Sequence, residues 1–269
     1  MSWPHLRAVI FDLAGTTVDH GCMAPVGVFV ELFRARGVEV TLAEARGPMG
    51  MHKRDHIAAV AALPRVRAAW TAAHGRPPSS ADIDAMYAAA GPLQVACIPD
   101  HSAPIAGAPE LAVRLRAAGI KVGNTTGYNA EMLAALLPGA ARRGWAPDAA
   151  VCVDDVPAGR PAPFLAWEAA KRLGVYPASA IVHVGDTLVD VQAGLNAGMW
   201  SVGVAATGNL VGLPADALAA LPAEEREARV EAAREALLEA GAHVVIDSVA
   251  DLDQVLSNLD RAVEAGARP

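Results

Sequence analysis

Side chains able to handle phosphate follow several short apolar runs of the chain. Asp12, Thr126 and Asp186 each stand close behind such a run, and Arg160 follows another a few residues later. Asp12 and Asp186 offer the oxygen ligands that Mg²⁺ prefers, and a free oxygen of Asp12 can attack phosphorus to form an aspartyl phosphate. Thr126 and Arg160 can hydrogen-bond the phosphate oxygens. Asp or Thr after a strand is often only a turn former, but four such positions together favour phosphoryl chemistry.

The elements that must position these residues are buried strands alternating with helices. The apolar runs are short and mostly β-branched, and they do not alternate with polar residues, as expected of strands covered on both faces of a parallel sheet. They lie at residues 6–11, 120–123, 149–153, 181–184, 200–204 and 243–246. Helical patterns separate most of them, so we predict a doubly wound α/β core. Ligands of such sheets bind beyond the carboxyl ends of the strands, where the four candidate residues meet.

One long stretch breaks this alternation. Residues 20–99 carry four helical apolar patterns and no convincing strand, which is far more chain than a crossover needs. We therefore predict a helical domain, residues 20–99, inserted after the first strand into an α/β core of residues 1–19 and 100–269.

Composition excludes several classes of protein. Among 269 residues, 22 basic against 29 acidic side chains give 22 − 29 = −7, which argues against nucleic acid or an anionic membrane as a partner. The uncharged stretch 191–215 contains five glycines and a proline, so we predict no membrane span. Three widely spaced cysteines and no apparent signal peptide favour a reducing, cytoplasmic location.

Four motifs resemble the signatures of the haloacid dehalogenase superfamily. They are DxxGT from Asp12, TTG at 125–127, the isolated Arg160, and GDTxxD at 185–190. The resemblance implies that Asp12 is the nucleophile, that Thr126 and Arg160 bind phosphate, and that Mg²⁺ is the cofactor. It also implies that the carboxylates of Asp12 and Asp186 and the backbone carbonyl of Ala14 ligate the metal, that Asp190 orients the site, and that the helical insertion is the cap domain.

Ala14 departs from the usual pattern of that superfamily. Its phosphatases usually carry a second Asp there, which protonates the leaving oxygen and later activates water. Alanine can do neither, so a phosphate ester would lose roughly 10²–10⁴-fold in rate. The enzyme is therefore a poor esterase, or its leaving group needs no proton.

Lys53 could support a reaction whose leaving group needs no proton. Only three of the 22 basic residues are lysine, and Lys53 lies in the predicted cap, on one helix face with His56. A primary amine can condense with an aldehyde, and the protonated imine lets carbon leave phosphorus as an enamine, which a guanidinium cannot do.

The segments around these residues narrow the resemblance to the phosphonatases, the C–P bond hydrolases of the superfamily. They are GCMAP (21–25), PMGMHKRDH (48–56), TTGY (125–128) and DDVPAGRPAP (154–163). This resemblance implies a small-molecule phosphonate partner, phosphonoacetaldehyde, cleaved to acetaldehyde and phosphate in 2-aminoethylphosphonate degradation. Lys53 would form the Schiff base, and the protein would be a homodimer through the cap.

Four further residues keep two interpretations each. His56 is a proton shuttle for imine formation or a surface residue, and Tyr128 contacts substrate or cap or merely packs. Cys22 and Met49 lie near the expected seam between cap and core, where they either support the catalytic groups from behind or form a plain apolar wall. Two other functions stay open: a Mg²⁺-dependent phosphomonoesterase or phosphomutase without a Schiff base, and a non-catalytic phosphate- or partner-binding protein.

Overall fold

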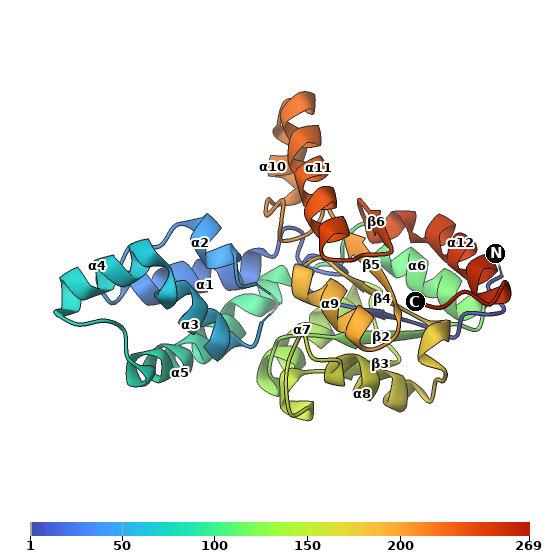
Figure 1. Ribbon diagram of the computed structural model, residues 1–269, viewed down its shortest axis with the longest axis horizontal. Coiled ribbons are helices and arrows are strands. Elements are labelled where there is room, and N and C mark those ends of the chain that lie inside the picture. Colours follow the sequence, from blue (N-terminus) through green and yellow to red (C-terminus); the bar gives the residue numbers. More distant parts are fainter. Residues whose placement is uncertain (1, 50) are drawn as a thin grey trace.

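The centre of the computed structural model, which describes residues 2–49 and 51–269, is a parallel β-sheet (Figure 1). Its six strands stand in the order β3-β2-β1-β4-β5-β6, and every neighbouring pair is parallel. They are β1 (Ala8–Phe11), β2 (Lys121–Thr125), β3 (Ala149–Val151), β4 (Ile181–Gly185), β5 (Trp200–Val204) and β6 (Val244–Ile246). The predicted doubly wound α/β core is confirmed. Gly50, part of the segment 48–56 used above, lies outside the described residues.

Helices cover both faces of this sheet because successive strand residues point to opposite sides. Val9 and Phe11 of β1 belong to one hydrophobic cluster, which includes α6 (Ala108–Ala117), α7 (Ala130–Arg142) and α12 (Leu252–Glu264). Ala8 and Ile10 face the other side, where they pack with α8 (Phe164–Leu173). On that second side, α9 (Leu188–Asn196) and α11 (Ala223–Glu239) share a further cluster. Short 3₁₀ turns complete the core at η1 (Ile98–His101), η2 (Val153–Asp155), η3 (Ala178–Ala180) and η4 (Val249–Asp251).

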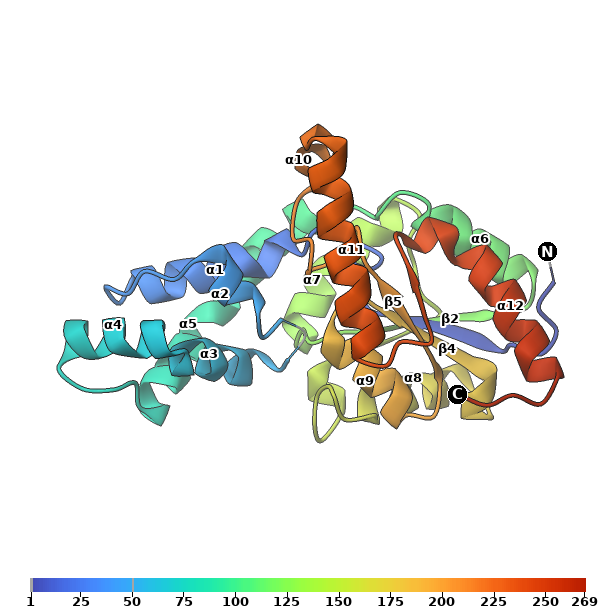
Figure 2. The same cartoon turned by 45° about the horizontal axis from the view of Figure 1, so that its top comes forward.

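The insertion between β1 and β2 is helical and has its own hydrophobic cluster. It contains α1 (Met23–Arg34), α2 (Leu42–Arg46), α3 (Lys53–Ala62), α4 (Pro64–His74) and α5 (Ser80–Cys97). Phe29, Phe33, Trp70 and Met86 are among the buried residues of this cluster, which draws no member from the sheet. Figure 2 shows these helices beside the sheet rather than on one of its faces. We call them the cap; its limits, 20–99, stay a prediction.

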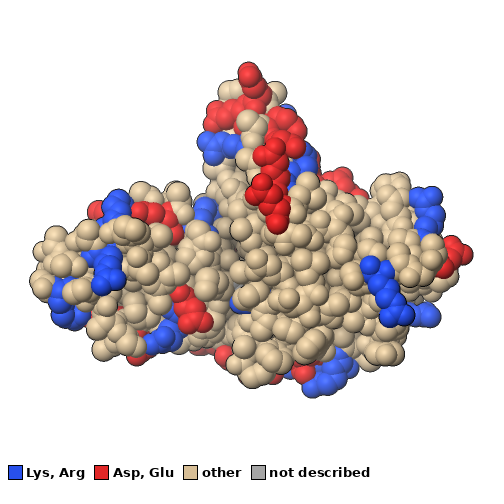
Figure 3. Space-filling model, viewed as in Figure 1, with Lys and Arg blue, Asp and Glu red and all other residues tan. Residues whose placement is uncertain are grey.

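The charge-rich segment near the C-terminus packs on the core with only part of its length. Val230, Ala233 and Leu237 are buried in α11, whereas its first turns and α10 (Ala215–Ala220) stand away from the sheet (Figure 1). Acidic side chains gather along α11 in Figure 3. Within the described part of the chain, no helix combines the length and apolarity that crossing a bilayer requires.

Candidate active site

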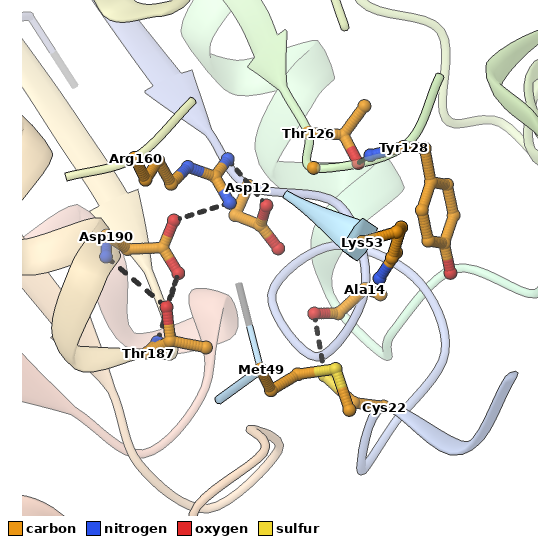
Figure 4. Close-up of a pocket in the computed structure, with 11 residues that line it drawn as sticks. Asp12, Ala14, Cys22, Met49, Lys53, Thr126, Tyr128, Arg160, Thr187 and Asp190 are labelled. Carbon is orange, nitrogen blue, oxygen red and sulfur yellow. Dashed lines mark hydrogen bonds and ion pairs between the residues drawn. The ribbon is translucent and has the colours of Figure 1, made fainter. Parts of the chain in front are cut away.

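A small cavity lies where the carboxyl ends of the strands meet the cap (Figure 4). The chain places Asp12 directly after β1, Thr126 directly after β2 and Asp186 directly after β4, as the spacing of the motifs predicts. The cavity is lined by Asp12, Ala14, Cys22, Met49, Lys53, Thr126, Gly127, Tyr128, Arg160, Thr187 and Asp190. Its volume is about 30 Å³. Residues of both the core and the cap form its wall, so a movement of the cap relative to the core would change access to it.

The guanidinium of Arg160 bridges two carboxylates that line the cavity. Its Nη2 lies 2.7 Å from Oδ1 of Asp12, and its Nη1 lies 2.8 Å from Oδ1 of Asp190. Nη2 also donates to the hydroxyl of Thr125 at 2.8 Å. Burial lowers the pKa of Arg160, but the carboxylates of Asp190 and Asp12 outweigh it and raise that pKa above its ordinary value. A charged, planar donor is therefore fixed beside the proposed nucleophile.

Asp190 is held in place by its own helix end. Thr187 and Asp190 form the capping box of α9, in which the Thr187 backbone N–H and hydroxyl both donate to Oδ2 of Asp190. The other oxygen of this carboxylate faces Arg160. Both oxygens of Asp190 therefore have partners, one at its own helix end and one in Arg160.

Oxygen atoms beside these ion pairs form a site suited to a hard cation. Oxygens of Asp12, Asp186 and Asp190 lie within 4.8 Å of one another. The carbonyl oxygen of Ala14 lies near this cluster, since Sγ of Cys22 donates to it at 2.9 Å and to Oδ2 of Asp186 at 3.3 Å. Burial raises the pKa of Asp186 to about 7, with the carboxylate of Asp190 acting in the same direction, so a bound cation would stabilise its charged form. The donors Asp12, Ala14 and Asp186 therefore fit Mg²⁺.

Lys53, the first residue of α3, brings an amine from the cap into this cavity. Only 5% of the residue is exposed, and its Nζ faces two aromatic rings, 5.4 Å from the centre of Phe29 and 5.2 Å from that of Tyr128. Among the residues that the structure describes, no carboxylate forms an ion pair with it. Burial lowers the pKa of Lys53 to about 8, although the nearby Cys22 and Asp12 oppose the shift. Roughly a tenth of the amine is thus neutral and nucleophilic at pH 7.

His56 lies one turn after Lys53 but does not line the cavity. It is fully buried, stacked on Phe29 with 3.8 Å between the ring centres, and its Nε2 lies 2.8 Å from the carbonyl oxygen of Ala45. Burial lowers the pKa of His56 to about 3, with the charge of Lys53 acting in the same direction. Its alternative assignment as a surface residue is wrong. As a neutral imidazole donating to Ala45, it supports the Phe29 ring beside the amine.

The other predicted residues lie on the cavity wall. Met49 and Cys22 are buried there, and Tyr128 presents its ring to Lys53 (Figure 4). The hydroxyl oxygen of Thr126 accepts from the backbone N–H of Tyr128 at 3.1 Å, which forms the turn after β2 and leaves the hydroxyl hydrogen available to a ligand.

Several residues of this site were not identified from the sequence. They are Phe29, Thr125 and Thr187, described above, and Thr16 and Asn209, which donate to Asp186 from a hydroxyl and from a backbone N–H. Thr16 and Thr187 stand inside the motifs DxxGT and GDTxxD, so the motifs themselves contained the signal. Phe29 has the same spacing as the other core residues of α1, and nothing in its neighbourhood sets it apart.

Sequence profiles assign the chain to a family of hydrolases. One described as haloacid dehalogenase-like hydrolase matches residues 6–198, and a second, described as HAD-hydrolase-like, matches residues 157–252. The chain belongs to the haloacid dehalogenase-like hydrolase family, and it is an enzyme of that family.

Similar proteins of this family bear a more specific name. The chain is 47% identical to a phosphonoacetaldehyde hydrolase of Paraburkholderia phytofirmans, over 98% of this chain and 99% of the relative. It is also 47% identical to one of Salmonella gallinarum, over 98% of each. A crystal structure of a phosphonoacetaldehyde hydrolase-like protein from Oleispira antarctica matches with a TM-score of 0.97 and 40% identity, over 100% of this chain and 98% of that one.

Proposed function

We propose that the protein hydrolyses the C–P bond of phosphonoacetaldehyde to acetaldehyde and phosphate, in the degradation of 2-aminoethylphosphonate. The observation that carries this function is the buried amine of Lys53 in one cavity with Asp12 and with alanine at position 14. The names of relatives that are 47% identical over nearly their whole length support the same substrate.

The reaction begins at the cap. The neutral amine of Lys53 adds to the aldehyde carbon, water leaves, and the resulting imine takes up a proton to become an iminium ion. The rings of Tyr128 and Phe29 face the nitrogen and favour its positive charge. The iminium draws electrons from the neighbouring carbon, which weakens the bond from that carbon to phosphorus.

Asp12 then takes the phosphoryl group. One of its oxygens bonds to phosphorus, the C–P bond breaks, and the electron pair of that bond forms an enamine on Lys53. Arg160, which bridges Asp12 and Asp190, stabilises the charge on the phosphoryl oxygens together with Thr126. Asp12, Asp186 and the Ala14 carbonyl would hold Mg²⁺, which would supply further charge neutralisation to the phosphoryl group.

Water completes the cycle on both residues. The enamine is protonated on carbon, and water releases acetaldehyde from Lys53, while a second water hydrolyses the aspartyl phosphate. With one water lost at imine formation, the net consumption is one water. The reaction needs no acid at position 14, because the leaving group is a carbon that departs as a neutral enamine and has no oxygen to be protonated. Alanine is therefore tolerated there.

The experiment that tests this function traps the imine. Incubation with phosphonoacetaldehyde and borohydride should inactivate the enzyme and add the reduced two-carbon adduct to Lys53, as seen by mass spectrometry. Lys53→Arg should form no adduct and lose C–P cleavage, whereas Lys171→Arg, a matched change at a largely exposed lysine, should behave as wild type. Full turnover by Lys53→Arg would instead favour a phosphomonoesterase or phosphomutase of the same family.

The proposal includes a metal, a cellular location and an oligomeric state. Mg²⁺ rests on the three oxygen donors, and a reducing, cytoplasmic location rests on three free cysteines. A homodimer through the cap rests on the resemblance alone, and sedimentation equilibrium of the wild-type protein tests it.

A further inference from the structure

Arg46, at the end of α2 in the cap, reaches across to the core. Its Nη1 donates to the carbonyl oxygen of Gly21 at 2.6 Å and to Oδ1 of Asn209 at 3.4 Å. The amide Nδ2 of Asn209 donates back to the carbonyl oxygen of Arg46 at 3.3 Å. Arg46 thus connects the cap both to the linker that leads out of the core and to the loop that follows β5.

That loop, residues 205–214, also holds the candidate metal ligand. The backbone N–H of Asn209 donates to Oδ2 of Asp186 at 2.7 Å. Gly208 packs so closely that an added Cβ would lie 2.5 Å from Cβ of Asp186. The same residue, Asn209, therefore bonds Arg46 through its side chain and Asp186 through its backbone.

The contacts around this junction leave little freedom. Gly212 has φ of +66°, and a Cβ there would lie 2.8 Å from Nε of Arg46. The N–H of Gly21 donates to the carbonyl of Thr207, and the hydroxyl of Thr207 donates to the carbonyl of Gly15. Linker, loop and metal-ligand segment thus form one hydrogen-bonded unit, and Arg46 is its contact from the cap.

We propose that Arg46 and Asn209 are positioning residues that couple docking of the cap to the placement of Asp186. When the cap docks, Arg46 fixes the Asn209 side chain, and the backbone of the same residue fixes the carboxylate for its cation. When the cap opens, Asn209 loses this partner, and the hold on Asp186 loosens. This inference rests on the metal site of the proposed function but not on the Schiff base. By linkage, the cation should strengthen cap docking by the same factor.

Calorimetric titration of the substrate-free protein with Mg²⁺ tests the coupling. Outer contacts that orient metal ligands typically change metal affinity 10–100-fold, so Arg46→Ala and Asn209→Ala should each weaken Mg²⁺ binding about tenfold. The double variant should bind Mg²⁺ no more weakly than either single variant, because both changes break the same chain of hydrogen bonds from Arg46 through Asn209 to Asp186. Arg229→Ala is the matched control: Arg229 lines the same surface groove as Arg46 but pairs with Glu225, and its loss should leave Mg²⁺ binding unchanged.

Hydrogen exchange at saturating Mg²⁺ supplies a second readout, which locates the effect along the chain. In the wild type, Mg²⁺ should slow exchange in residues 205–214 and in the cap linker around Gly21; in Arg46→Ala it should slow exchange only in the loop. Arg46→Lys keeps the positive charge but not the planar guanidinium. Its Mg²⁺ affinity should therefore stay closer to that of Arg46→Ala than to that of the wild type. Wild-type affinity in both alanine variants would overturn the coupling while leaving the metal site standing. Equal Mg²⁺ binding by wild type and Asp186→Asn would instead contradict the metal site and the coupling together, and the borohydride experiment would still test the Schiff base.

Discussion

The pH dependence of the Lys53 amine is the most direct consequence of its burial. Lys53 lies among Cys22, Asp12 and Arg160, and burial lowers its pKa to about 8 from an ordinary 10.5. At pH 7 roughly 9% of such an amine is neutral, and at pH 9 roughly 91%, a rise of about tenfold. For an amine at 10.5, the same step in pH would raise the neutral fraction from roughly 0.03% to roughly 3%, a rise of about a hundredfold.

Brief acetylation measures this difference without any substrate. The protein is pulsed with acetic anhydride at a series of pH values, and mass spectrometry follows each lysine separately. The chain has only three lysines, and Lys121 and Lys171 are exposed, so they serve as references within the same molecule. The limited access to Lys53 lowers its absolute rate but not the shape of its profile, which should level off above pH 8 to 9.

A hundredfold rise at Lys53 between pH 7 and 9 would refute the effect of burial on its pKa. The neutral amine at pH 7 would then be about 300-fold scarcer than the structure implies, and imine formation at neutral pH would need another cause.

Three further changes test other parts of the site. Lys53→Met should raise the free energy of unfolding at pH 7 by about 1–3 kcal/mol in urea titrations, because the folded protein no longer buries an ammonium. The free energy of unfolding of the wild type should also rise between pH 8 and 10.5, because the unfolded chain binds more protons than the folded one in that range. The variant should lack this rise. Arg160→Lys should slow phosphate release at least 100-fold, since one ammonium cannot bridge Asp12 and Asp190. Borohydride trapping at Lys53 should persist. Loss of trapping would contradict the separation of imine formation on Lys53 from phosphoryl transfer to Asp12. Ala14→Asp should raise hydrolysis of a phosphate ester by up to about 10²-fold and lower C–P cleavage, and an unchanged ratio of the two rates would count against the leaving-group explanation.

Much of the core was predictable because its signals are local. Buried parallel strands are short apolar runs whatever their partners, and the carboxyl end of each run marks where a ligand-binding side chain must stand. Asp12, Thr126 and Asp186 could therefore be assigned to one edge of the sheet before any contact was known. The cap helices followed from their helical spacing, and the separation of cap from core followed from the missing strands.

The contacts between distant segments could not be predicted in the same way. Arg46 and Asn209 are 163 residues apart, and neither stands in a motif, so only the folded chain brings them together. For His56, helical spacing fits either a surface or a buried residue, and stacking on Phe29 decides between them. The pairing of Arg160 with Asp190 depends on the capping box of α9, whose sequence signal, Thr187 with Asp190, is equally typical of a simple helix start.

The separate hydrophobic cluster of the cap has a consequence for the ancestry of such enzymes. In the proposed reaction, strand ends of the core handle phosphorus, and carbon is handled by one amine on a unit that packs mainly against itself. Substitutions in the cap can therefore change which substrate is accepted while the phosphoryl-transfer residues of the core stay the same.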